Sequence, residues 1–293
     1  MNAEQDITGA TSVYGIIGCP VSHSFSPVMH NAAMRCACIN GVYVPFNVDP
    51  ANLSHAVKGM RALQLAGFNV TIPHKTAIMP LLDELAPTAI QAGAVNTVVN
   101  QGGRLIGHNT DGDGLIASLQ QDLGFDIAGA RVLLVGAGGA ARGALAALCR
   151  SGVQSVFVVN RTMDSAVSLI EFFADTFPEV VLRATCFDEQ LEALLPETDL
   201  IINATPLGMT GDKNDRLVLA LLPDHAKVYD MVYNPPLTPF LQEAEERGLK
   251  AVNGLGMLVA QGELAFRIWH GKSAGAGVMR EVLLSACSVP AKA

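Results

Sequence analysis

The sequence predicts an α/β protein with two domains: an N-terminal α/β substrate domain with a mainly parallel sheet, and a Rossmann-type dinucleotide-binding domain. Three observations support this fold class. Short apolar runs alternate with helix-like segments along most of the chain, which is typical of parallel sheets. A glycine-rich turn at 136–140 joins one such run to a helical segment. The chain has 293 residues, enough for two domains that each bury a core.

The first series of elements has the order β-α-β-α-β. We expect strands at 13–18, 42–48 and 68–72, and helices at 27–39 and 52–65. The segments 94–100 and 104–107 then flank Gln101-Gly102-Gly103, a composition that favours a hairpin turn. Because hairpin strands are antiparallel, we expect the first sheet to be mixed.

A second alternating series begins at Arg131. The expected strands are 131–135, 155–160, 181–185, 199–203, 227–232 and a short strand near Ala251, and the expected helices are 139–149, 163–175 and 237–247. Further helical segments, 114–121 and 254–270, border this series. We therefore expect the dinucleotide domain at 112–253, and a discontinuous substrate domain made of 1–111 and 254–293.

Composition narrows the class of protein. The net charge is −8 and no long basic run occurs, so we expect no nucleic-acid partner. The six cysteines form no CxxC and lack zinc-ligand spacing with the seven histidines, which predicts small buried thiols and no metal site. The first ten residues include acidic residues and no apolar core, and no apolar run reaches about 18 residues. We expect a soluble cytoplasmic protein without a membrane partner, either a monomer or a homodimer.

The turn after the run 131–135 has the G-x-G-x-x-A form of a dinucleotide fingerprint. It consists of Gly136, Ala137, Gly138, Gly139, Ala140 and Ala141. The first glycine permits a tight turn, the second lets the backbone approach a pyrophosphate, and the alanine allows close packing of helix and strand. The following helix N-terminus favours a phosphate group. The alternative is a glycine-rich turn without a ligand, but the strand before it and the helix after it favour dinucleotide binding.

The end of the next strand indicates which dinucleotide binds. Asn160, Arg161 and Thr162 stand where an NAD site typically has Asp or Glu. A carboxylate would repel a 2′-phosphate, whereas a guanidinium group binds one, often through two hydrogen bonds. This favours NADP, and the alternative is that Arg161 is a solvated loop charge.

Polar residues near the first series are candidates for a substrate site. Ser26 before Pro27 suits a helix N-cap, and the pair Ser24 and Ser26 is evenly balanced between capping and ligand binding. Asn69 and Thr71 share one face near the carboxyl end of a predicted parallel strand, where ligands bind. Lys75 lies just beyond this strand, and its alternative role is a solvated charge.

Three further polar residues stand in apolar or structured surroundings. Asn96 interrupts the apolar run 94–99. Asp111 precedes a helical segment, so a capping or turn role competes with a functional one. Gln261 lies inside an apolar helix, where a buried amide needs partners, and a ligand is one candidate.

Together with further sequence blocks, these residues make the chain resemble the shikimate dehydrogenase family over residues 13–271. The resemblance depends on the order and spacing of nine blocks together, since no single block is specific. The blocks are Ser22-His-Ser-Phe-Ser-Pro27, Asn69-Val-Thr-Ile-Pro-His-Lys75, Gly93-Ala-Val-Asn-Thr97, Asn109-Thr-Asp-Gly112, Gly136-Ala-Gly-Gly-Ala140, Asn160-Arg-Thr162, Asn203-Ala-Thr-Pro-Leu-Gly208, Tyr229-Asp-Met-Val-Tyr-Asn-Pro235 and Gly254-Leu-Gly-Met-Leu-Val-Ala-Gln261.

The resemblance implies reversible, NADPH-dependent reduction of 3-dehydroshikimate to shikimate, a step of chorismate and aromatic amino acid biosynthesis. It implies Lys75 as the catalytic acid/base and Asp111 as its partner. It implies that Met231 and Gly254 line the nicotinamide side. The implied shikimate contacts are Ser24, Ser26, Thr71, Asn96 and Gln261, with Tyr233 nearby.

Two features of this chain bear on the alternatives. Relatives that hold the 2′-phosphate with two arginines have the second one where this chain has Ser165, preceded by Asp164, so weaker NAD use is also expected. Quinate-using relatives tend to replace a serine of the Ser-x-Ser pair with Thr, whereas this chain keeps both serines. The alternatives are a quinate/shikimate dehydrogenase with broad cofactor use, and a non-catalytic regulator that binds shikimate or nucleotide. Retention of Lys75 and Asp111 argues against the regulator.

Overall fold

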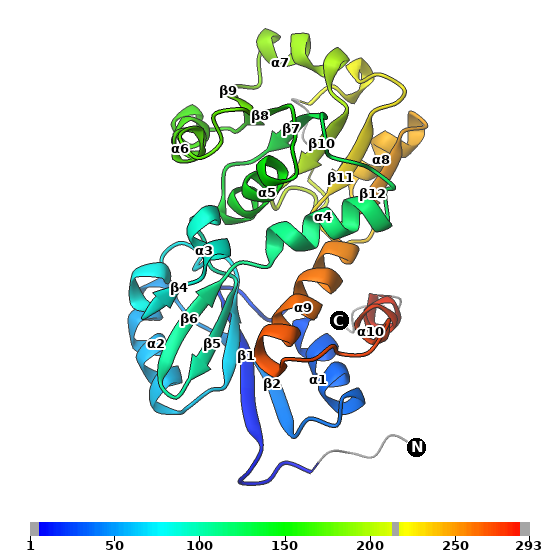
Figure 1. Ribbon diagram of the computed structural model, residues 1–293. Coiled ribbons are helices and arrows are strands. Elements are labelled where there is room, and N and C mark those ends of the chain that lie inside the picture. The colour runs from blue at the N-terminus through cyan, green and yellow to red at the C-terminus, as the bar shows by residue number, and fades with distance from the viewer. Residues whose placement is uncertain (1–5, 213–216, 288–293) are drawn as a thin grey trace. The chain divides into compact units, whose positions relative to one another are not determined.

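Two six-stranded sheets organise the residues that the computed structural model describes, 6–212 and 217–287 (Figure 1). The chain divides into two compact units. Unit 1 comprises the described residues of Met1–Thr110 and Val259–Ala293, and unit 2 those of Asp111–Leu258. Each unit has its own sheet and its own buried core.

The sheet of unit 1 has the strand order β2-β1-β3-β5-β6-β4. Its strands are β1 (Ser12–Gly18), β2 (Gly41–Asn47), β3 (Gly67–Val70), β4 (Glu84–Leu85), β5 (Thr97–Gln101) and β6 (Arg104–His108). β1 pairs in parallel with β2 and β3, and β5 runs antiparallel to β3 and β6. The expected mixed sheet and its hairpin are confirmed. Gly102 and Gly103 form the hairpin turn at φ 62° and 94°, values that glycine adopts without strain.

Helices cover the sheet of unit 1 and bury its apolar side chains. They are α1 (Ser26–Cys36), α2 (Leu53–Ala62), α3 (Pro87–Ala92), α10 (Val278–Cys287) and the part of α9 (Leu255–His270) from residue 259 onward. Val57 and Met60 of α2 pack with Phe68 of β3 in one core cluster. α10 packs against α1, so the C-terminal part of the chain completes the N-terminal unit.

The sheet of unit 2 is parallel throughout, with the order β12-β11-β10-β7-β8-β9. Its strands are β7 (Arg131–Val135), β8 (Ser155–Val159), β9 (Val181–Thr185), β10 (Leu200–Asn203), β11 (Lys227–Asp230) and β12 (Lys250–Asn253). Its helices are α4 (Asp111–Gln121), α5 (Gly139–Arg150), α6 (Met163–Ala174), α7 (Glu189–Leu194) and α8 (Pro239–Glu246). Numbered within the unit, this order is 3-2-1-4-5-6, the Rossmann arrangement. The predicted fold class is confirmed.

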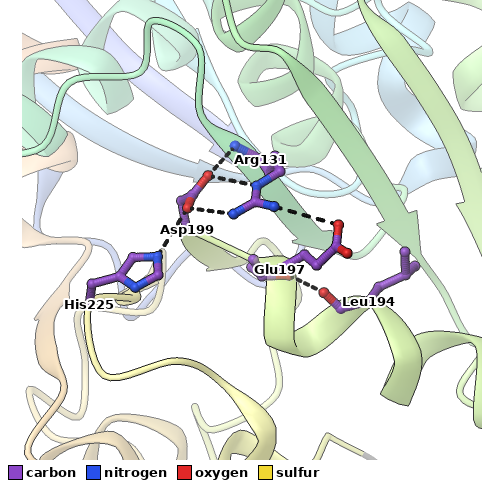
Figure 2. Close-up of polar contacts among 6 residues, drawn as sticks. Arg131, Leu194, Glu197, Asp199 and His225 are labelled. Carbon is purple, nitrogen blue, oxygen red and sulfur yellow. Dashed lines mark hydrogen bonds and ion pairs between the residues drawn. The ribbon is translucent and has the colours of Figure 1, made fainter.

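A polar cluster lies at the edge of this sheet where its parallel strands begin (Figure 2). Asp199, just before β10, accepts hydrogen bonds from the Arg131 backbone nitrogen at 2.8 Å and from its Nε at 3.2 Å. His225 Nε2 lies 3.2 Å from the same carboxylate, and Glu197 lies 3.5 Å from the Arg131 guanidinium. The cluster ties the starts of two neighbouring strands together, at the edge opposite the glycine-rich turn.

The structure corrects several expected boundaries. β3 ends at Val70, so Thr71 and Ile72 lie in the following turn and not in the strand. The turn forms because Pro73 has no N–H to continue the ladder, and the His74 N–H instead donates to the Thr71 carbonyl at 2.9 Å. The short β4, α3 and α7, together with α10, were not predicted. The expectation of buried thiols is wrong for Cys36 and Cys38, which are exposed.

Candidate active site

The Ser-x-Ser pair lies at the start of α1, but its capping differs from the prediction. Ser26 is the first residue of the helix and Phe25 occupies the N-cap, without a side-chain cap. The predicted capping role of Ser26 is therefore wrong. Ser24 Oγ instead accepts a hydrogen bond from the Ser26 backbone nitrogen at 3.2 Å. Ser26 is buried, so its hydroxyl is held inside unit 1.

The backbone around Lys75 is tied to the surrounding sheet. The buried His74 ring places Nε2 2.7 Å from the Val48 carbonyl oxygen. The Val95 N–H donates to the Lys75 carbonyl at 2.8 Å. Lys75 is half-buried, as is Thr71 at the start of the turn. His74 contributes to this anchoring, and sequence reasoning missed it because a single histidine beside a lysine carries no pattern.

Asn96 and Gln261 come together in unit 1 although 165 residues separate them. Both are buried, at 3% and 8% exposure. Asn96 Nδ2 donates to Gln261 Oε1 at 3.4 Å and to Thr110 Oγ1 at 2.8 Å, and the Thr110 hydroxyl donates to the Gln261 carbonyl at 3.1 Å. The expectation that the Gln261 amide is buried with partners is confirmed, and these partners are protein groups.

Asp111 follows Thr110 directly and is the first residue of α4, where it is buried at 5% exposure. Asp111 and Asp113 supply negative charge to the first turn of this helix, a favourable place because the helix N-terminus is partly positive. Further along α4, Gly112 packs closely on α5, since a Cβ there would lie 2.4 Å from the Gly143 carbonyl oxygen.

In unit 2, the glycine-rich turn has the geometry of a phosphate cradle. Gly136 follows β7 with φ 110°, a left-handed conformation that requires glycine, and a Cβ there would lie 2.9 Å from Thr205 Cγ2. Gly138 is the N-cap of α5 and makes no side-chain cap. A Cβ on Gly138 meets no described protein atom within 4 Å, so it would project into the space before the α5 N-terminus. The residues present therefore fit a pyrophosphate group there.

The second part of the dinucleotide site follows β8. Asn160 Nδ2 donates to the Thr162 carbonyl at 2.9 Å, which shapes the turn into α6. Arg161 is exposed and forms no ion pair with the residues that the structure describes. Arg142, on the first turns of α5, is a cation that sequence reasoning missed. Its guanidinium carbon lies 5.1 Å from the centre of the Phe172 ring, and burial lowers its pKa.

The loops after β11 and β12 bring Met231 and Gly254 together. A Cβ on Gly254 would lie 2.2 Å from the Met231 carbonyl oxygen, so only glycine fits this contact. Asp230, the fully buried last residue of β11, accepts hydrogen bonds from Asn203 Nδ2 at 2.9 Å and Thr238 Oγ1 at 2.6 Å. Burial raises the pKa of Asp230, although these hydrogen bonds oppose the shift.

Met231 and Tyr233 are both half-buried in the loop that Asp230 shapes.

Within the two described ranges, no helix is long and apolar enough to cross a membrane. Three or more His, Cys, Asp or Glu side chains in a metal-binding arrangement do not occur among the described residues.

The strand order of unit 2 and the turn at Gly136 define a Rossmann-type dinucleotide-binding protein with a second α/β unit. Three family models match the chain. Residues 16–98 match the shikimate dehydrogenase substrate binding domain, residues 118–210 match shikimate/quinate 5-dehydrogenase, and residues 254–284 match the shikimate 5′-dehydrogenase C-terminal domain. The chain belongs to the shikimate dehydrogenase family.

Individual relatives extend over nearly the whole chain. The shikimate dehydrogenase (NADP(+)) of Geobacter metallireducens is 49% identical, over 96% of this chain and 99% of the relative. A Thermus thermophilus shikimate 5-dehydrogenase in complex with NADP(H) and shikimate is 37% identical with TM-score 0.84, over 94% of this chain and 100% of that chain. A Corynebacterium glutamicum quinate dehydrogenase in complex with NAD is 30% identical with TM-score 0.86, over 94% and 99%.

Proposed function

We propose that this protein is an NADP-dependent dehydrogenase that interconverts 3-dehydroshikimate and shikimate. The observation that carries the proposal is the group of buried polar side chains in unit 1, which includes Ser26, Asn96 and Gln261. Hydroxyl and amide groups of this kind suit a small polyhydroxylated carboxylate. The name and the near-complete match of the Geobacter relative support the same substrate and cofactor.

In the proposed reaction, bound NADPH supplies a hydride for the carbonyl carbon of 3-dehydroshikimate. Negative charge then grows on the carbonyl oxygen, and the Lys75 ammonium stabilises that charge and donates a proton to it. Asp111 orients Lys75 and accepts a hydrogen bond from a neighbouring substrate hydroxyl. In the reverse direction, Lys75 accepts the proton of the shikimate hydroxyl, and bound NADP⁺ would take up the hydride from the same carbon.

The proposal assigns the remaining site residues to binding. The substrate is bound by Ser24, Ser26, Thr71, Asn96, Gln261 and Tyr233. The pyrophosphate lies against Gly136, Ala137, Gly138, Gly139 and Ala140, the adenosine end against Asn160, Arg161 and Thr162, and the nicotinamide against Met231 and Gly254. The exposed Arg161 and the open space beside Gly138 support NADP in this place.

The proposal includes a dinucleotide domain at 112–253 and a cytoplasmic location. All six cysteines are free thiols, which suits a reducing compartment.

Quinate is the second candidate substrate, because a quinate dehydrogenase shares the fold at 30% identity. Steady-state rates with shikimate and quinate, each with NADP⁺ and with NAD⁺, separate the two candidates. We expect the highest kcat/KM for shikimate with NADP⁺, since the Ser-x-Ser pair and Arg161 are both present. A higher kcat/KM for quinate, or for NAD⁺, would contradict the proposal. Tight binding of shikimate and NADP⁺ without turnover would instead indicate a regulator.

A further inference from the structure

We propose that Tyr43 is a positioning residue that orients Asn96 for substrate binding through a buried chain of hydrogen bonds. Tyr43 is in neither the predicted site nor the family blocks described above. The inference rests on the proposed function, because it concerns how the substrate is held. All the residues involved lie in unit 1.

The first half of the hydrogen-bond chain runs from Tyr43 on β2 to Asn69 on β3. Tyr43 is 1% exposed, and its hydroxyl donates to Asn69 Oδ1 at 2.7 Å. Asn69 Nδ2 then donates to the Asn96 carbonyl oxygen at 3.0 Å and to Thr97 Oγ1 at 3.0 Å. The Asn69 amide therefore has its oxygen toward Tyr43 and its nitrogen toward the 96–97 segment.

The second half of the hydrogen-bond chain sets the orientation of the Asn96 amide. The Thr97 hydroxyl donates to Asn96 Oδ1 at 3.0 Å, and the Thr110 backbone nitrogen donates to the same oxygen at 2.8 Å. Because that oxygen is held by two donors, Asn96 Nδ2 points toward Thr110 Oγ1 and Gln261 Oε1. Every bond from Tyr43 to Asn96 runs in the same donor-to-acceptor sense, so the direction of the first fixes the direction of the last.

Burial raises the pKa of Tyr43, and the Ser26 side chain opposes this rise. Ser26, the first residue of α1, therefore lies near the hydroxyl at which the hydrogen-bond chain begins.

Aromatic packing fixes the position of the Tyr43 ring. His30 of α1 stacks on it, with ring centres 4.6 Å apart and an interplanar angle of 10°. Trp269 of α9 lies 6.1 Å from it and donates from Nε1 to the Val98 carbonyl at 2.9 Å. The helices that carry Ser26 and Gln261 therefore both hold this ring, and the hydroxyl has little freedom to move away from Asn69.

The substitution Tyr43→Phe removes the hydroxyl and keeps the ring. Asn69 Oδ1 then lacks its donor in a buried place, and the Asn69 amide is free to turn and present its nitrogen instead. We expect the KM for shikimate to rise about tenfold, which corresponds to about 1.4 kcal/mol. We expect the KM for NADP⁺ to stay within about twofold of the wild-type value and kcat within about threefold, because the lost interaction affects substrate binding.

Tyr14→Phe is the matched control. The Tyr14 ring belongs to the same aromatic cluster, 5.3 Å from Trp269, and its hydroxyl makes no hydrogen bond to the residues described in the structure. We expect this variant to keep the wild-type KM for shikimate. A purely structural role of Tyr43 would lower the melting temperature and the active fraction in Tyr43→Phe while leaving both KM values unchanged, and that result would overturn the inference.

A second pair of variants changes the hydrogen-bond chain at Thr97. These variants test the inference even if Tyr43→Phe does not fold. Thr97→Val removes the hydroxyl at nearly constant volume, and Thr97→Ser retains it. We expect Thr97→Val to raise the KM for shikimate by a similar factor and Thr97→Ser to keep it. The double variant Tyr43→Phe/Thr97→Val should raise the KM no more than the larger single effect, because both break one chain.

The positioning role alone would be overturned if the wild-type enzyme turns over shikimate and neither Tyr43→Phe nor Thr97→Val changes the KM for shikimate. A wild-type enzyme that does not turn over shikimate would overturn the proposed function and, with it, this inference.

Discussion

His30 should make this protein sensitive to mild acid. Its ring is fully buried in α1, and neither ring nitrogen has a hydrogen-bond partner among the residues described. Burial, and to a lesser extent the nearby His270, lowers the pKa of His30 from 6.5 to about 3. His270, next to Lys272, has a pKa lowered to about 4 by burial and by that lysine. Both histidines are therefore neutral in the folded protein at pH values where they are protonated in the unfolded chain.

The magnitude follows from proton linkage. Between the folded and unfolded pKa values, the unfolded state binds more protons, so the free energy of unfolding falls as the pH falls below about 6.5. Each pH unit in this window costs about 1.4 kcal/mol per histidine. From pH 7 to pH 5, His30 alone should lower the free energy of unfolding by about 2 kcal/mol. That is a sizeable fraction of a typical domain stability of about 5–15 kcal/mol.

The assay is urea unfolding at pH 7 and pH 5, followed by the fluorescence of Trp269. This is the single tryptophan of the chain, and its ring centre lies 5.2 Å from that of His30, so it reports on unit 1. The variant His30→Phe keeps a ring against Tyr43 and removes the titrating group. We expect it to lose about 2 kcal/mol less than the wild type between the two pH values. His55→Gln, at an exposed position, should behave as the wild type does. Equal losses in the wild type and His30→Phe would refute the reasoning.

Three further predictions concern the chemistry, the cofactor and the scaffold. Lys75→Ala should lower kcat by at least about 10² with little change in KM, and near-wild-type kcat would remove Lys75 from its proposed role. Arg161→Ala should raise the KM for NADP⁺ about tenfold or more and leave that for NAD⁺ within about twofold, because only NADP⁺ has the 2′-phosphate; equal effects on both would contradict this. Burial raises the pKa of Asp199, but hydrogen bonds from Arg131 and His225 outweigh burial and hold that pKa below its usual value. The ionised Asp199 therefore stabilises the folded state at neutral pH, and this contribution is lost in acid. Asp199→Asn should therefore lower the free energy of unfolding at neutral pH by about 1–3 kcal/mol in urea titrations; a raised KM for NADP⁺ would show that the cluster in Figure 2 also shapes the cofactor site.

Much of the fold follows from local pattern. Apolar runs of strand length and the glycine turn after 131–135 predict the Rossmann sheet, because parallel strands are buried on both faces. The buried amide at Gln261 also follows from its position inside an apolar helix. Elements such as β4 and α3, with two and six residues, are too short to show a period. α10 was missed even though Met279 and Leu283, four residues apart, are both buried.

The contacts that shape the site were harder to predict, because they join distant segments. Nothing in the spacing of Tyr43, Asn69 and Asn96 indicates that one hydrogen-bond chain connects them. Thr71 was assigned to a strand because period-2 alternation continues past the place where Pro73 ends the ladder. Ser26 was assigned to the N-cap because Ser-Pro suits that position, but the helix begins one residue earlier than the pattern indicates.

The central claim is that this chain transfers a hydride from NADPH to the carbonyl carbon of 3-dehydroshikimate. Mass spectrometry of the product formed from NADPH carrying deuterium at the transferable position of the nicotinamide tests it most directly. The account predicts shikimate with one deuterium at the new carbinol carbon, and none at that carbon when unlabelled NADPH is used in deuterated water. The absence of shikimate, or a label derived from the solvent, would contradict it.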